Sequence, residues 1–202
     1  MPLFRRAPHE DAPDRSIVVG LGNPGDEYAS TRHNAGARVV EVLLDRAGAS
    51  FKRHKSGCLV AETTLAGRRV ALARPISYMN ESGGPVGRLA RWYKVPASDL
   101  VVVHDEIDIP FGEVRVKVGG GTAGHNGLGS LVSHLGTKDF IRVRVGVGRP
   151  RGRSGAVDHV LNGFSSAERK VLPDLLDRAA DAVERMLEVG VERAMNEVNT
   201  RD

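Results

Sequence analysis

The sequence predicts a single-domain α/β protein with a mixed, mostly parallel sheet and helices on both faces. Two observations favour this class. Short apolar runs rich in valine alternate along the chain with amphipathic patterns of helical period. The length of 202 residues, with 41% hydrophobic and 27% charged residues, suits one globular domain that has a substantial core.

The order of these patterns gives the expected elements. The apolar runs predict strands at residues 17–21, 59–64, 69–73, 100–104, 114–118 and 141–147. The amphipathic patterns predict helices at residues 35–47, 82–93, 126–135 and 174–189. Leu65-Ala66-Gly67 is typical of a hairpin turn between the second and third strands. Pro173 suits the first turn of the last helix, and Gly190 suits its C-terminal cap.

The segments outside this pattern set the expected domain limits. Residues 1–15 are polar, lack the apolar core of a signal peptide, and are expected to be a disordered extension. The domain is expected at residues 16–196, followed by a C-terminal tail at 197–202. Residues 148–155 form a loop rich in glycine and arginine. No apolar run is long enough to cross a bilayer, and the single Cys58 suits a reducing compartment, so we expect a cytoplasmic location. We also expect a monomer without an obligatory protein partner.

Local charge is more informative than net charge. The formal net charge is only +4, which an ordinary solvated surface explains. Basic residues nevertheless cluster at residues 51–55 and again at Arg142, Arg144, Arg149, Arg151 and Arg153. Such clusters suit a polyanion such as RNA. Aromatic residues make up only 4% of the chain, which argues against base stacking on an aromatic platform.

Polar side chains recur where apolar runs or glycine-rich turns end. They are Asn23 with His33, Asn80, Asp105, and His125 with Asn126. Because parallel strands share their carboxyl edge, these groups are expected to gather there. A histidine can act as a general base near neutral pH, a carboxylate can orient it, and amide groups can stabilise an oxyanion. The set therefore predicts hydrolysis of an acyl compound by water.

Each residue also has a structural interpretation. His33 could be a polar residue at a helix start, Asn23 a turn residue before Pro24, and Asn80 a helix cap. Asp105 could simply end a strand. The coincidence of all these residues favours the functional interpretation.

The motifs that other enzyme classes require are absent or incomplete. Residues 20–25 and 119–124 both fit G-x-G-x-x-G, but the acids at the required distance, Glu41 and Asp45, lie within a helical pattern, so dinucleotide binding is not expected. We expect no metal site, since no paired histidine spacing accompanies the acidic run at Asp105. We expect no organic cofactor. The chain has neither G-x-S-x-G nor a Walker A loop.

The motifs together resemble a known family. The matching blocks, which run from about residue 17 to residue 196, are Gly20-Leu21-Gly22-Asn23-Pro24-Gly25 with Tyr28, Thr31-Arg32-His33-Asn34-Ala35-Gly36, Tyr78-Met79-Asn80-Glu81-Ser82-Gly83, His104-Asp105-Glu106-Ile107-Asp108-Ile109-Pro110, Gly124-His125-Asn126-Gly127-Leu128 and Arg142-Val143-Arg144-Val145-Gly146-Val147-Gly148. They closely resemble the bacterial-type peptidyl-tRNA hydrolases. The resemblance implies hydrolysis of the ester that joins a peptide to tRNA, which recycles tRNA after aborted translation.

The resemblance also implies roles for single residues. His33 would be the catalytic base, with Asp105 as its partner and Asn23 in the catalytic group. Further substrate contacts would come from Tyr28, Tyr78, Asn80, His125 and Asn126. Lys117 and Arg144 would bind the 5′-phosphate of the tRNA.

Two features depart from the family pattern. Ala123 stands where family members usually carry glycine, and residues 1–15 are a longer extension than usual. We expect Ala123 to be unstrained, because the glycines around it already supply flexible points. The alternative function is a noncatalytic tRNA-binding paralogue, and a nucleotide-dependent oxidoreductase is a more distant one.

Overall fold

The computed structural model describes residues 15–150 and 155–200. The expected disordered extension therefore lies outside the described residues except for Arg15, as do residues 151–154 of the glycine- and arginine-rich loop and residues 201–202 of the tail. Within the described part of the chain, no helix combines the length and the apolar character that a membrane span requires.

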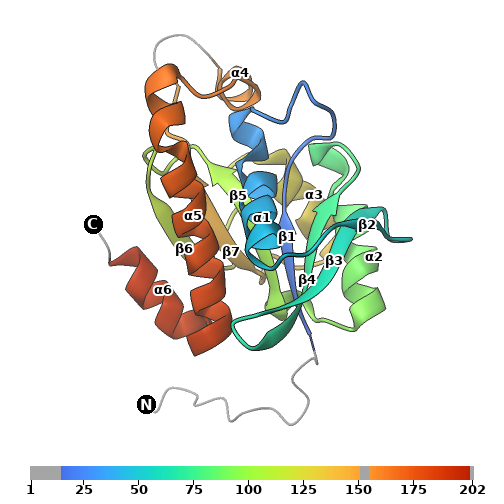
Figure 1. Ribbon diagram of the computed structural model, residues 1–202. Coiled ribbons are helices and arrows are strands. Elements are labelled where there is room, and N and C mark those ends of the chain that lie inside the picture. Colours follow the sequence, from blue (N-terminus) through green and yellow to red (C-terminus); the bar gives the residue numbers. More distant parts are fainter. Residues whose placement is uncertain (1–14, 151–154, 201–202) are drawn as a thin grey trace, which may run out of the picture.

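The chain folds around one seven-stranded mixed sheet, in the order β2-β3-β4-β1-β5-β7-β6 (Figure 1). The strands are β1 (Ser16–Gly20), β2 (Lys52–Arg53), β3 (Cys58–Leu65), β4 (Arg68–Pro75), β5 (Leu100–Glu106), β6 (Val114–Val118) and β7 (Ile141–Gly146). Strands β4, β1, β5 and β7 run parallel, whereas β2, β3 and β6 pair antiparallel at the two edges. The carboxyl ends of the four parallel strands therefore share one edge.

Helices cover both faces of this sheet (Figure 1). They are α1 (Ala35–Arg46), α2 (Gly83–Tyr93), α3 (Asn126–Leu135), α4 (Ala156–Leu161), α5 (Ser166–Val189) and α6 (Val191–Asn199), with short 3₁₀ turns at η1 (Arg32–Asn34), η2 (Met79–Glu81) and η3 (Ala97–Asp99). Helices α1 and α5 pack on one face and α2 and α3 on the other. The expected α/β class with helices on both faces is confirmed.

Alternating side chains of the central strands build two cores. Val18 faces the core under α1 and α5, whereas Ile17 and Val19 face the core under α2 and α3. The strand is therefore buried on both faces, as its continuous apolar run indicates. Packing on both faces holds each central strand in place up to its carboxyl end. The polar residues that follow the strands therefore start from fixed positions.

The fold differs from the expectation in its last third. Helix α5 begins at Ser166 rather than at residue 174, so Pro173 lies inside the helix and not in its first turn. A capping box between Ser165 and Glu168 starts the helix earlier. Gly190 does end α5. With a φ of 86°, it also connects α5 directly to α6, a helix that the hydrophobic periodicity did not predict. Residues 197–199, placed in the expected tail, lie in α6.

The hairpin between β3 and β4 forms where the sequence places it. Its turn residues Ala66 and Gly67 have φ values of 47° and 73°. Both values lie in the left-handed region. A two-residue hairpin turn requires positive φ at both residues when its twist matches that of the flanking strands.

Two glycines let α1 approach the sheet closely. A Cβ atom on Gly36 would collide with the carbonyl oxygen of Val103 in β5, and one on Gly20 would collide with the carbonyl oxygen of Gly36. The start of α1 therefore lies directly against β1 and β5. This contact brings the residues of η1, which precede the helix, within reach of the carboxyl end of β5.

Candidate active site

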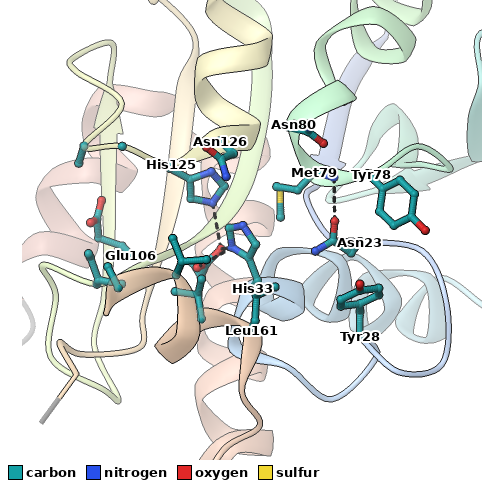
Figure 2. A pocket seen from close by; sticks show the side chains of 17 residues that line it. Asn23, Tyr28, His33, Tyr78, Met79, Asn80, Glu106, His125, Asn126 and Leu161 are labelled. Atoms are coloured by element: carbon teal, nitrogen blue, oxygen red, sulfur yellow. Dashed lines mark hydrogen bonds and ion pairs between the residues drawn. The ribbon is translucent and has the colours of Figure 1, made fainter. Parts of the chain in front are cut away.

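The loops at the carboxyl edge of the parallel strands enclose a cavity of about 470 Å³ (Figure 2). Many of the residues singled out in the sequence line it: Asn23, Tyr28, His33, Tyr78, Asn80, Asp105, His125 and Asn126. They come from the loop after β1, from η1, from the segment after β4, from β5 and from the start of α3. The sheet therefore brings together groups from distant parts of the chain, as the parallel strand order predicts.

His33 and Asp105 form a buried pair at the floor of this cavity. The Nδ1 atom of His33 lies 3.0 Å from both carboxylate oxygens of Asp105. A carboxylate can only accept, so Nδ1 carries the proton and donates it. The lone pair of the neutral ring is then on Nε2. This arrangement is the one that a histidine general base requires.

His125 is the second imidazole on the same carboxylate. Its Nδ1 accepts hydrogen bonds from the backbone N–H groups of Gly127 and Leu128 at 3.1 and 3.3 Å, which caps α3. The proton must then lie on Nε2, which donates to Asp105 at 2.9 Å. Asp105 therefore holds both rings, and each ring presents an N–H to it.

The environment keeps Asp105 ionised. Burial by itself would raise the pKa of Asp105, but the hydrogen bonds and charge interactions with His125 and His33 outweigh burial and hold that pKa well below its usual range. His104, the preceding residue, is fully buried, and burial together with His125 lowers the pKa of His104 to about 3. His104 is therefore neutral near pH 7, and it donates from Nδ1 to the carbonyl oxygen of Asp105 at 2.8 Å.

Asn23 is fixed by two neighbours. The side chain of Asn34 accepts from the backbone N–H of Asn23 at 2.8 Å and donates to its carbonyl oxygen at 2.9 Å. The side-chain oxygen of Asn23 accepts from the N–H of Met79 at 2.8 Å. This bond leaves the amide NH₂ of Asn23 free to face the cavity (Figure 2). Asn34 was not among the predicted site residues, although its place beside His33 in the motif is a signal for it.

The upper walls of the cavity are apolar and aromatic. Tyr28 and Tyr78 meet edge to face, with ring centroids 6.4 Å apart. A further wall is α4, which contributes Val157, Val160 and Leu161. Val157 and Leu161 are exposed. Because six residues are too few for a clear helical period, no pattern in the sequence indicated this wall.

Lys117 and Arg144 lie outside the cavity, on the antiparallel pair β6 and β7. Lys117 pairs with Arg142 in the register, so Lys117, Arg142 and Arg144 share one face of the sheet. Arg144 is already paired, since its Nε and Nη2 atoms lie 3.1 and 3.0 Å from one oxygen of Glu106. Glu106 also lines the cavity, and this pair therefore links the cavity to the basic face.

Arg142 differs from Arg144 despite the shared face. Only 3% of Arg142 is exposed, and its guanidinium donates to the carbonyl oxygens of Gly120, Gly121 and Lys138. It therefore ties the glycine loop, which leads to His125, to strand β7. The basic cluster that the sequence shows thus contains one structural arginine.

His33, Asp105 and His125 also form a group whose ligand atoms lie within 4.8 Å of one another. Histidine and carboxylate ligands suit several divalent metals. Here the nitrogen that each ring turns toward Asp105 is protonated, as the hydrogen bonds require. A metal would have to replace both of these protons.

The expectation for Ala123 is wrong. Ala123 has a φ of 48°, in the left-handed region that costs an L-residue free energy, and Gly124 follows with a φ of 76°. The neighbouring glycines do not relieve the strain, because the turn into α3 needs positive φ at this position as well.

We therefore expect Ala123→Gly to stabilise the fold. Relief of left-handed strain is worth about 1–2 kcal/mol, and the greater unfolded-state entropy of glycine offsets about 0.4–1 kcal/mol of it. The melting temperature should rise by about 2–4 °C per kcal/mol of net gain. Thermal melts of wild type and variant measure this, with Ala97→Gly, at a position outside the left-handed region, as the control. A lower melting temperature for Ala123→Gly would show that the loop is not strained.

Comparison with known proteins agrees with this geometry. The family model described as peptidyl-tRNA hydrolase matches residues 17–202. The chain is 58% identical over 180 residues to a peptidyl-tRNA hydrolase of Frankia casuarinae, covering 89% of this chain and 91% of the relative. It is 57% identical over 184 residues to one of Mycolicibacterium vanbaalenii, covering 91% and 96%. The crystal structure of peptidyl-tRNA hydrolase from Acinetobacter baumannii superposes with a TM-score of 0.86 at 38% identity, covering 93% of this chain and 96% of that one. The family model spans nearly the whole described chain and every block that lines the cavity, and the chain belongs to the peptidyl-tRNA hydrolase family.

Proposed function

We propose that the chain hydrolyses the ester bond between peptide and tRNA in peptidyl-tRNA and so recycles tRNA after aborted translation. The observation that supports this most is the His33–Asp105 pair, with Nε2 of His33 unprotonated in a cavity lined by three asparagines. Water activation by a histidine beside amide donors is chemistry suited to an ester.

Each residue has a proposed step. Nε2 of His33 removes a proton from water as the water oxygen attacks the ester carbonyl carbon. Asp105 stabilises the imidazolium that results. The NH₂ group of Asn23, held by its bond to Met79, donates to the carbonyl oxygen as negative charge develops there. The bond to the ribose oxygen of tRNA then breaks, and this oxygen takes the proton from His33.

The remaining lining residues are proposed to hold the substrate. Asn80 and Asn126 are exposed at the rim, where their amides can bind the peptide backbone or the terminal nucleotide. Tyr28 and Tyr78 offer aromatic surface in the same cavity. His125 orients Asp105 while it lines the substrate channel. We further propose that the protein acts in the cytoplasm as a monomer.

One assay tests the activity. The protein is incubated with N-acetyl-aminoacyl-tRNA, and the release of free tRNA is followed. Release that depends on His33 supports the proposal. Tight tRNA binding without release would support the noncatalytic paralogue, and a saturable NAD(H) titration would support the oxidoreductase. Glu41, one of the acids that a dinucleotide would need, lies in α1 and is instead bound to Arg74.

The basic face offers a separate prediction about binding. Lys117→Ala and Arg144→Ala should each raise KM for full-length substrate and leave turnover at saturation nearly unchanged. Each lost phosphate contact should lower the log–log salt slope by roughly one unit. Steady-state kinetics at several salt concentrations measure both effects. Lys170→Ala, an exposed lysine on α5, is the control.

The substrate itself provides a second control. A minimal substrate that lacks the tRNA 5′-phosphate should respond little to either variant. An equal loss on both substrates would mean that Lys117 and Arg144 support folding or chemistry rather than phosphate binding.

A further inference from the structure

A second basic surface lies on the outer side of α2, along β2 and the turn that follows it. It comprises Lys52, which pairs with Val60 and so lies on the α2 side of the sheet, with Lys55, Arg88, Arg91, Lys94 and Trp92, and we call it the α2 surface. All six residues are exposed. None of them lines the cavity described above.

The cations of the α2 surface have no acidic partners. None of the five forms an ion pair with another residue in the described part of the chain. Arg46, on the other side of the sheet, is by contrast surrounded by Asp177, Asp181 and Glu184. The carboxylate of the nearby Glu62 does not pair with these cations, because Tyr93 and Arg15 both bind it. Five cations without acidic partners leave a positive field that favours an anionic partner.

Trp92 adds an exposed aromatic ring to the cations of the α2 surface. It is the single tryptophan of the chain, and it is 53% exposed. The Nζ atom of Lys55 lies 3.5 Å from the centroid of the Trp92 ring, and the centroids of the His54 and Trp92 rings are 5.6 Å apart. A half-exposed aromatic ring among cations is typical of surfaces on which an unpaired base stacks while its phosphates are neutralised.

The backbone beneath these side chains is fixed. The Nε atom of Arg88 donates to the carbonyl oxygen of Ser56 at 2.9 Å, which joins α2 to the β2–β3 turn. Within the turn, His54 Nδ1 accepts from the N–H of Ser56 at 3.1 Å, and the N–H of Gly57 donates to the carbonyl oxygen of His54 at 3.0 Å. The backbone that carries these side chains is therefore held in place before any partner arrives, which lowers the entropy cost of binding.

We propose that the α2 surface binds RNA that carries an unpaired nucleotide, with a base stacked on Trp92 and the phosphates held by the surrounding cations. Duplex RNA fits less well, because its bases are already stacked on one another. An acidic protein would use the charges but would not need the exposed ring. The low aromatic content of the chain argued against such stacking, yet a single well-placed ring is sufficient.

Trp92 makes the proposal directly measurable. Because the chain has no other tryptophan, its fluorescence reports on this surface alone. A twelve-nucleotide oligouridylate should quench the emission in a saturable manner that weakens with salt. A polyglutamate of equal length should not quench it. No quenching by the oligonucleotide at low salt, or equal quenching by polyglutamate, would overturn the proposal.

A charge variant with a matched control localises the binding. Lys52→Gln/Arg91→Gln/Lys94→Gln keeps the tryptophan and its contact with Lys55, and removes three exposed cations that form no side-chain hydrogen bond with the described residues. Its affinity for the oligonucleotide should fall about ten- to a hundredfold near 0.1 M salt. Arg46→Gln/Arg185→Gln/Arg193→Gln removes the same charge from ion-paired sites. It should bind within about twofold of wild type, since only contacts to phosphate lower the affinity, and an equal loss in both variants would overturn the assignment.

Kinetics then distinguish two sources of the RNA. If the unpaired nucleotide belongs to a loop of the substrate, the charge variant should raise KM for full-length peptidyl-tRNA but not for a peptidyl minihelix. If it belongs to another RNA, both KM values should remain unchanged while quenching is still lost. The fluorescence measurement needs no hydrolysis, so it stands even if the proposed catalytic function fails.

Discussion

Replacement of His33 by alanine should reduce turnover by about 10²- to 10⁴-fold, the usual contribution of a general base. Nε2 of His33 is the unprotonated imidazole nitrogen that faces the cavity, because Nδ1 is committed to Asp105 and Nδ1 of His125 is committed to the backbone. No other described group lining the cavity offers the same base in the same place. Single-turnover hydrolysis of N-acetyl-aminoacyl-tRNA measures the loss.

Binding should be nearly unaffected in this variant. The proposed phosphate contacts, Lys117 and Arg144, lie on β6 and β7 rather than at His33. The affinity for deacylated tRNA should therefore match that of wild type. His134→Ala, at the far end of α3, is the control and should retain full turnover. Near-wild-type turnover in His33→Ala would remove this residue as the base.

Asp105→Asn should reduce turnover almost as much as His33→Ala does, because two histidines depend on this carboxylate. The carboxylate of Asp105 accepts an N–H from His33 and another from His125. An asparagine offers one acceptor oxygen and one donor NH₂. One ring must then change its tautomer or lose its bond. If His33 changes, its proton moves to Nε2, and the base is lost.

The expected loss in turnover for Asp105→Asn is again about 10²- to 10⁴-fold, as for other buried carboxylates that fix a histidine tautomer. A His125→Asn substitution in the Asp105→Asn background provides a further test. It removes the competing N–H donor of the imidazole, so the side-chain amide oxygen introduced by Asp105→Asn becomes free to accept from His33. Partial recovery of turnover is expected in the double variant relative to Asp105→Asn alone. Unchanged turnover in Asp105→Asn would remove Asp105 from the mechanism.

Folding stability should also depend on Asp105. Its pKa is lower in the folded state than in the unfolded chain, so the ionised carboxylate stabilises the fold above the unfolded pKa. This contribution is lost progressively as pH falls through the unfolded pKa toward the folded one. Asp105→Asn should therefore show a weaker decline of stability in acid than wild type does, measured by denaturant unfolding at several pH values.

The sequence by itself determined the architecture and the content of the site. Doubly buried apolar runs such as that of β1 specify a parallel core, and a parallel core places the residues after its strands at one edge. Asn23, His33, Asp105 and His125 could therefore be assigned to one cavity from their positions in the chain. The hairpin turn at Ala66 and Gly67 followed from local turn chemistry in the same way.

Tertiary structure decided what depends on long-range contacts or on the course of the backbone. The early start of α5 is the exception, because the capping box of Ser165 and Glu168 is a local signal that the proline at residue 173 obscured, although Arg32 also binds Glu168 from a distant part of the chain. The strain at Ala123 depends on how the loop enters α3, and the different environments of Arg142 and Arg144 depend on which of them meets backbone carbonyl groups and which meets Glu106. Sequence patterns record which face a residue occupies, but a single φ angle or the partner of a guanidinium follows only from the packing of segments distant in the chain.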